Sequence, residues 1–199
     1  MKASLRPLST ELRAYARMPQ TGVSLQQFLD FGTDLSSEKL IQASNFLRHE
    51  LPVRLAHRVM DLNHLPHGLS DMSSVQLVRD WYMRSFDELY AFPKVTNLNS
   101  EHEFTALLSD IKERHNATLY TMAKGVYELK QEMFQSLGTE DNPRKDLGEK
   151  ILQQKDMADL ADIHQFLDGF YMCRIGIRML MSQHIALHEP EKGWVGCIW

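Results

Sequence analysis

Apolar residues recur at spacings of three and four along most of this sequence, and this period constrains the fold more than any other feature. The stripes run through residues 73–91, 101–135 and 157–188, while glycine and proline gather between them. A period near 3.6 residues predicts amphipathic helices, and no stretch shows the alternation of a strand. We therefore predict an all-α fold, an antiparallel four-helix bundle with short N-terminal helices, forming one domain over residues 1–190.

Capping residues and helix breakers set the expected boundaries of these helices. The polar stretch Gln135–Lys155 is broken by glycine and proline, so we interpret it as a surface insertion. The first two predicted helices are Leu12–Met18 and Leu25–Phe31, and Ser24 caps the second. The third helix begins at Ser36 or Ser37 and runs to about Leu62 with a kink at Pro52, a turn follows at His64–Gly68, and the fourth helix runs from Ser73 or Ser74 to about Ala91. The last two helices run from Glu101 to about Gln135, with a capping box of Ser100 and Glu103, and from about Met157 to His188.

Polar side chains stand on three of the core stripes. Tyr82 and Ser85 share the stripe of Val78 and Leu89, while His115 and Arg174 each interrupt an apolar stripe of their own. A buried polar group is costly unless it is hydrogen-bonded, and a buried charge is costly unless it is paired. These residues therefore need partners inside the bundle.

Arg174 and Arg178 lie four residues apart, so their guanidinium groups share one helix face. One interpretation is an internal salt bridge, with Asp80, Asp168 or Glu128 as partner. The other is a pocket that binds a small carboxylate through Arg174, with Tyr82 and Ser85 as further donors. The residues alone leave both interpretations open.

The remaining reactive side chains do not form a catalytic motif. His115 is expected to be a satisfied core or boundary residue, because no nucleophile can be argued beside it. His184 and His188 have the i,i+4 spacing of a zinc pair, but the turn lacks a glutamate and a third ligand is not identifiable. We predict no metal site.

Phe28 and Phe31 fall on one face of a short helix that Phe46 can join. Core packing explains such a face, and an apolar groove for a partner is the alternative.

Charge and hydropathy exclude two classes of partner. The net charge is −4, whereas a nucleic-acid binder needs a basic field, and no apolar run reaches the roughly 18–20 residues that span a bilayer. The first 17 residues carry four basic side chains and one acid, which fits either a mitochondrial transit peptide or an exposed basic helix. We therefore expect neither nucleic acid nor membrane as a partner.

Five strings resemble the regulatory domain of the mitochondrial pyruvate dehydrogenase kinases, in unbroken order over about residues 20–188. The plant-like members are most similar, and branched-chain ketoacid dehydrogenase kinase is a less similar sister family. The strings are SLQQFLDFG at 24–32, FLRHELPVRLA at 46–56, SVQLVRDWYMRSF at 74–86, RHNATLYTMAKGV at 114–126 and HQFLDGFYMCRIGIRMLMSQH at 164–184.

The resemblance implies a kinase of the mitochondrial matrix that phosphorylates serines on the decarboxylase subunit and inactivates the pyruvate dehydrogenase complex. It implies docking on the lipoyl domain of the acyltransferase core, and homodimerisation through a second domain. It also implies a pocket for pyruvate or dichloroacetate. The implied pocket residues are Leu55, Tyr82, Ser85, Ile111, His115, Arg174, Ile177 and Arg178, and the implied lipoyl-docking residues are Val23, Phe28, Phe31 and Phe46.

Within this family His115 corresponds to a histidine that hydrogen-bonds the catalytic glutamate of an ATP-binding domain. We find no glycine-rich lid string, and residues 191–199 resemble the start of the linker to that domain. We therefore expect no cofactor in this chain, with ATP and magnesium needed only by a full-length member. The expected function is the regulatory domain of a protein-serine kinase. The alternatives are a non-catalytic module that modulates the 2-oxoacid dehydrogenase complex or the full-length kinase, and a sensor of small carboxylates.

Overall fold

The computed structural model describes residues 8–33, 36–136 and 161–188, and these ranges are helical without any strand, which confirms the all-α prediction. None of the helices in the described ranges has the length and apolar character needed to cross a membrane. The helices are α1 (Thr10–Tyr15), α2 (Leu25–Thr33), α3 (Ser37–Asn63), the 3-10 helix η1 (Pro66–Asp71), α4 (Ser73–Ala91), α5 (Leu98–Arg114), α6 (Thr118–Ser136) and α8 (Ala161–Ala186).

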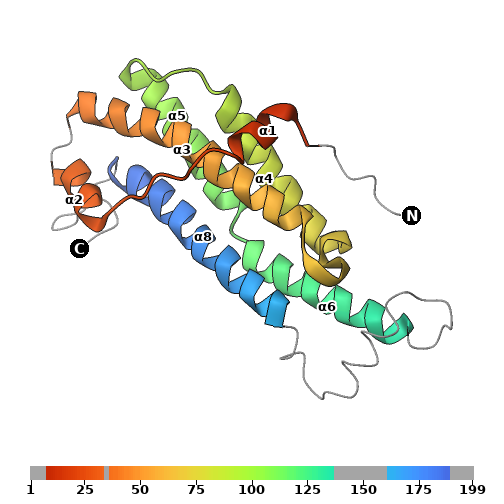
Figure 1. Ribbon diagram of the computed structural model, residues 1–199. Helices are drawn as coiled ribbons and strands as arrows, with labels where there is room; N and C mark the ends of the chain where they lie inside the picture. Colours follow the sequence, from red (N-terminus) through yellow and green to blue (C-terminus); the bar gives the residue numbers. More distant parts are fainter. Residues whose placement is uncertain (1–7, 34–35, 137–160, 189–199) are drawn as a thin grey trace.

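The long helices run side by side in alternating directions (Figure 1). Helix α4 runs antiparallel to α3 and beside it. Helices α5 and α6 follow one another in the same direction as α3, and α8 runs back beside them. We interpret this arrangement as an antiparallel four-helix bundle in which α5 and α6 together take the place of one helix. Helix α1 packs on the outside of α3, where Leu12 is buried.

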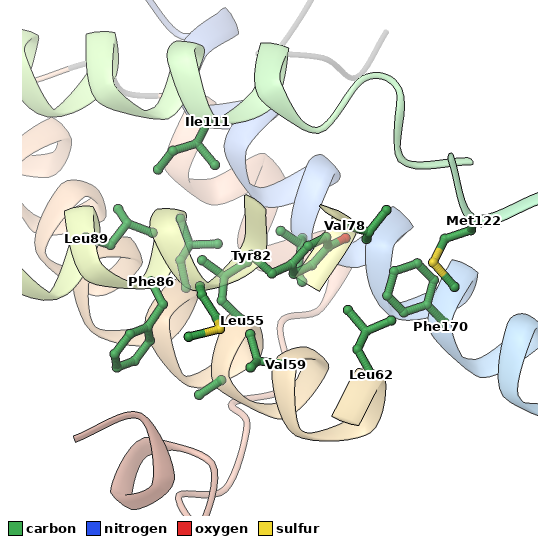
Figure 2. Packing of buried hydrophobic residues seen from close by; sticks show 14 of the residues in the cluster. Leu55, Val59, Leu62, Val78, Tyr82, Phe86, Leu89, Ile111, Met122 and Phe170 are labelled. Carbon is green, nitrogen blue, oxygen red and sulfur yellow. The ribbon is translucent and has the colours of Figure 1, made fainter. Parts of the chain in front are cut away.

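The core follows the predicted stripes. Figure 2 shows side chains from α3, α4, α5, α6 and α8 meeting in the interior, with Tyr82 among them. Burial of this apolar surface is the main force that holds the helices together. The buried stripe residues are Val75, Val78, Tyr82, Ser85 and Leu89 on α4, Phe104, Leu108 and Ile111 on α5, Met122 and Leu129 on α6, and Ile163, Phe170, Ile177 and Met181 on α8.

Side-chain caps begin three of these helices: α1, where Ser9 Oγ accepts from the Leu12 amide at 3.1 Å, and also α2 and α5. Ser24 caps α2 as predicted, because its Oγ accepts from the Gln27 amide at 3.2 Å. The predicted capping box of α5 is wrong. The helix begins three residues earlier, at Leu98, with Asn97 as its N-cap and Ser100 in the reciprocal position. Asparagine caps as well as serine does, and a serine hydroxyl replaces the expected glutamate.

The predicted continuous helix over residues 101–135 is also wrong, because the chain breaks between α5 and α6. His115 ends α5 with φ −85° and ψ 2°, and its carbonyl accepts from the Thr118 amide in a turn. The break frees carbonyls at the end of α5, and partners from α8 satisfy them. The apolar period continues across the interruption, so the periodicity did not indicate it.

The connection between α3 and α4 contains a left-handed turn. His67 has φ 58° and Gly68 has φ 77°, so the predicted turn at His64–Gly68 is present and continues into η1. Pro52 lies within α3, and a bend at this proline stays a prediction. The predicted insertion at Gln135–Lys155 lies almost entirely outside the described residues.

Gly125 lies where α6 packs closely against the start of α4. A Cβ built on Gly125 would stand 2.5 Å from Cγ2 of Val75, a β-branched side chain with little rotamer freedom. We expect Gly125→Ala to destabilise the fold by about 1–2 kcal/mol, despite alanine's better helix propensity. Gly169→Ala is the matched control, since its Cβ meets nothing within 4 Å. Urea unfolding measures both, and equal or opposite ranking of the two variants would contradict the close packing.

Candidate functional site

Tyr82 on α4 and His115 at the end of α5 form a buried aromatic pair. Their ring centroids lie 4.4 Å apart with an interplanar angle of 13°, so the rings are stacked. Phe170 of α8 also lies next to the tyrosine ring, with a centroid distance of 5.8 Å and an interplanar angle of 47°. Helices α4, α5 and α8 thus converge on Tyr82, which is fully buried.

Ser85 connects this pair to a charged network. Its hydroxyl donates to the Trp81 carbonyl at 2.9 Å and accepts from Arg114 Nη1 at 2.9 Å. The hydroxyl has only one proton, and this proton is donated to Trp81. In the third contact, with His115 Nε2 at 3.0 Å, the histidine must therefore be the donor, so Nε2 carries the proton. Arg114 also pairs with both carboxylate oxygens of Glu88, at 2.8 and 3.0 Å.

The two arginines of α8 bind the end of α5. Arg174 Nη2 donates to the His115 carbonyl at 3.2 Å, and Arg178 Nη1 donates to the Lys112 carbonyl at 3.1 Å. Arg178 Nη2 also donates to Oδ1 of Asn116 at 2.9 Å. Carbonyls at a helix C-terminus lack internal partners and favour cations, so both arginines act as caps supplied by another helix.

The predicted internal salt bridge is therefore not what the structure contains. Within the described ranges Arg174 pairs with none of the three carboxylates considered. Asp80 contacts Arg79 at 3.2 Å, and Glu128 accepts from the hydroxyls of Ser73 and Ser74. Asp168 is exposed.

Burial changes the protonation of these groups. It raises the pKa of Tyr82 to about 12, although Arg174 and Arg58 oppose the change. Burial likewise lowers the pKa of His115 to about 4, and the neighbouring Arg114 adds to this effect. The imidazole is therefore neutral at pH 7. The pKa of Arg174 is lowered mainly by burial and then by Arg178.

Several buried polar atoms beside this network have no hydrogen-bond partner in the described part of the chain. They include the Tyr82 hydroxyl and Nε of both Arg58 and Arg174. A buried polar atom without a partner costs free energy comparable to a lost hydrogen bond. Such atoms are places where a ligand or water can add a bond.

A cavity of about 260 Å³ opens between α3 and α8 with Arg58 in its wall, whereas Tyr82 and Arg174 are not among the residues that line it. Two of its lining residues, Arg58 and Cys173, interact electrostatically with Tyr82. Sequence reasoning singled out neither Arg54 nor Arg58 here. The spacing of Arg58 three residues after Leu55, on the same helix face, was the available signal. The lining residues are Gln20, Arg54, Arg58, Met172, Cys173, Gly176 and Ile177.

The eight residues predicted to form a carboxylate pocket divide into four groups. Tyr82, Ser85, His115 and Arg174 lie together, whereas Ile177 alone lines the cavity and Arg178 caps α5. Leu55 and Ile111 belong to the apolar core around Tyr82 (Figure 2).

A second, apolar groove lies between the α2 segment and the far ends of α3 and α8. Three of the four predicted docking residues, Val23, Phe28 and Phe46, line it, and the side chain of Phe31 is outside the described set. The remaining lining residues are Ala43, Leu47, Leu180, Gln183, His184 and Leu187.

Comparison with known proteins shows that this chain is similar to a class of mitochondrial kinases. Residues 22–199 match the family described as mitochondrial branched-chain alpha-ketoacid dehydrogenase kinase. The chain belongs to this family, and it corresponds to the N-terminal regulatory domain of the pyruvate dehydrogenase kinases within it.

Three curated relatives illustrate the likeness. The mitochondrial pyruvate dehydrogenase (acetyl-transferring) kinase of Arabidopsis thaliana is 39% identical, over 94% of this chain and 45% of its own length. Human isozyme 1 is 37% identical over 93% of this chain and 38% of its own length. The Drosophila melanogaster kinase is 34% identical over 98% of this chain and 44% of its own length. The chain thus spans less than half the length of these relatives.

The lowered pKa of His115 predicts an acid-sensitive fold. The unfolded histidine titrates near 6.5 and the native one near 4, so the unfolded chain binds the extra proton between these values. Stability should therefore fall as the pH falls through this window, and His115→Asn should reduce that fall. Urea unfolding at pH 7.5 and 4.5 should show the wild type losing about 2 kcal/mol more than the variant. His49→Asn, at an exposed position, is the control. Equal losses in wild type and His115→Asn would contradict this assignment.

Proposed function

We propose that this chain is the regulatory domain of a kinase that inactivates the pyruvate dehydrogenase complex by phosphorylating its decarboxylase subunit in the mitochondrial matrix. The names of its relatives support the complex and the organelle. In this proposal the chain senses a small carboxylate and docks on a lipoyl domain of the acyltransferase core. ATP and magnesium serve the catalytic step of a full-length member and are not bound by the helices described above.

The observation that carries the carboxylate site is the set of unpartnered polar atoms beside Tyr82. The tyrosine hydroxyl is a neutral donor, because its pKa is near 12, and it points into an environment with Arg58, Arg174 and Arg178 nearby. A carboxylate accepts hydrogen bonds from hydroxyl and guanidinium groups at once, and it offsets the uncompensated positive charge. Pyruvate and similar 2-oxoacids carry a carboxylate that suits the charge of this site.

The groove supports the second part of the proposal. Aromatic and aliphatic side chains from three segments line it, and its polar lining is limited to Gln183 and His184. A long, thin acyl chain such as the lipoyl group gains affinity by burying its methylenes in such a groove. Val23, Phe28 and Phe46 are the docking residues within the described chain, and Phe31 remains a prediction.

His115 provides the connection to catalysis. In this proposal the histidine positions a glutamate of the ATP-binding domain of a full-length member, and a possible homodimer forms through that same domain. The contact with Ser85 fixes the Nε2 proton, and burial keeps the ring neutral, so Nδ1 has a lone pair. Arg174 also donates to the His115 carbonyl. A ligand bound to Arg174 could therefore influence the histidine through this one side chain.

The alternative function is a non-catalytic module that modulates the 2-oxoacid dehydrogenase complex or the full-length kinase. The groove favours it, since lipoyl docking needs no catalytic residue. The two functions differ in whether carboxylate binding changes the activity of a kinase that contains this domain.

The carboxylate site is tested by thermal unfolding with millimolar pyruvate or dichloroacetate. We expect the wild type to gain a few degrees in Tm. Tyr82→Phe removes the unpartnered hydroxyl, so the variant should be at least as stable without ligand yet gain less on adding it. Arg174→Ala should also abolish the gain. Arg84→Ala, at an exposed arginine of α4, is the control. An undiminished gain in Arg174→Ala and Tyr82→Phe would rule out this site.

Docking in the groove is tested by titration calorimetry with an isolated lipoylated domain. Phe46→Ala should weaken binding by about tenfold, because a half-buried aromatic side chain that contacts the ligand is lost. Tyr120→Ala removes a highly exposed aromatic side chain of α6 and should leave the affinity unchanged. Circular dichroism checks that both variants are folded. Absence of heat with wild-type protein, or equal binding of unlipoylated domain, would argue against the groove as the docking site.

A further inference from the structure

A buried carboxylate stands at the opposite end of α5 from His115. Glu101 lies in the first turn of this helix and its side chain is fully buried. Two hydroxyl groups donate to its Oε1: Ser44 Oγ from α3 at 3.3 Å and Thr105 Oγ1 from the next turn at 3.2 Å. Its charged partners within the described ranges are imidazoles, and no lysine or arginine contacts it. A buried anion without a cationic partner is strongly disfavoured.

Two histidines from the end of α8 converge on this carboxylate. His184 Nε2 lies 3.1 Å from Oε1, and His188 Nε2 lies 2.8 Å from Oε2. The three potential ligand atoms all lie within 4.8 Å of one another. We call Glu101, His184 and His188 the histidine–glutamate cluster. Glutamate is the third ligand that the sequence did not identify for the pair, and it comes from a helix 83 residues earlier in the chain (184 − 101).

The hydrogen bonds of His188 require a positive species in the cluster. Its Nδ1 lies 3.0 Å from the His184 carbonyl, which can only accept, so Nδ1 carries a proton. A neutral imidazole has no second proton, and Nε2 then presents a lone pair to a carboxylate oxygen 2.8 Å away. Two lone pairs at this distance repel one another, so either a second proton or a metal ion must lie between them.

The arrangement of the cluster favours the metal ion. Two histidines and one glutamate are the ligand set of zinc sites that keep a fourth position open. Ligating histidines typically donate their other N–H to a backbone carbonyl, as His188 does, and ligating carboxylates are held by further hydrogen bonds, as Ser44 and Thr105 hold Glu101. Zinc bonds of about 2.0–2.2 Å in a tetrahedron separate the ligands by about 3.3–3.5 Å, so each histidine Nε2 needs to move away from its glutamate oxygen by roughly 0.2–0.7 Å.

We propose that Glu101, His184 and His188 bind a zinc ion, with a fourth position open toward His102. His102 is exposed, and its Nδ1 lies 3.7 Å from Glu101 Oε2, so the ion has access from solvent at this edge. The bound ion neutralises the buried carboxylate and ties the end of α8 to the start of α5. This inference does not rest on the proposed carboxylate sensing or on lipoyl docking, although His184 also lines the apolar groove.

The test is isothermal titration calorimetry, in which zinc chloride is added to the metal-stripped, untagged chain. We expect one zinc per chain with a dissociation constant below about 10 µM, and a rise in Tm on binding. His188→Ala removes a partly exposed ligand at the helix end and should weaken binding at least tenfold. His49→Ala, at an exposed histidine of α3, should bind zinc as the wild type does.

Cobalt(II) provides a readout that does not depend on stability. Its visible absorption in a tetrahedral nitrogen–oxygen site should appear with the wild type and with His49→Ala, and should be lost in His188→Ala and in Glu101→Gln. Circular dichroism establishes that each variant is folded, and His188→Ala alone decides the question if Glu101→Gln does not fold. No zinc uptake by the wild type, or equal uptake by His188→Ala, would overturn the proposal and leave a protonated histidine as the cation.

Discussion

The interruption between α5 and α6 is the constraint on which the rest of this structure depends. A helix that ends inside a bundle leaves carbonyls without partners, and these must be satisfied from elsewhere. Arg174 and Arg178 of α8 do so at 3.2 and 3.1 Å. Their position on an otherwise apolar face is thus explained by the break itself. Two cations from a distant helix thus stabilise an interruption of the helix in the interior of the bundle.

The break also sets the chemistry of the interior. It presents the His115 ring to Tyr82 and Ser85 and not to the apolar stripe that continues along α6. The result is a polar layer with aromatic stacking, a neutral imidazole and arginines that retain unused donors. A purely apolar bundle would pack more simply, and this polar layer is the part of the interior on which the proposed carboxylate site depends.

Helical periodicity was sufficient to predict the all-α fold and the residues on the buried stripes, since burial follows the 3.6-residue period. The break at His115 was not predictable in this way, because the period continues through it. The partners of Arg174 were also missed, since backbone carbonyls have no sequence signature. Arg58 meets Tyr82, and Glu101 meets His184 and His188, only through tertiary packing. Glu101 lies 87 positions from His188, and no local pattern indicates such a contact.

His184 belongs to two neighbourhoods at once. Its ring forms part of the wall of the apolar groove, and its Nε2 faces Glu101. A side chain shared in this way makes the two places thermodynamically reciprocal: whatever fixes the orientation of the ring from one side alters affinity on the other by the same factor. An acyl group in the groove and a cation on the carboxylate would therefore cooperate or compete, and the sign depends on which rotation of one imidazole each of them selects.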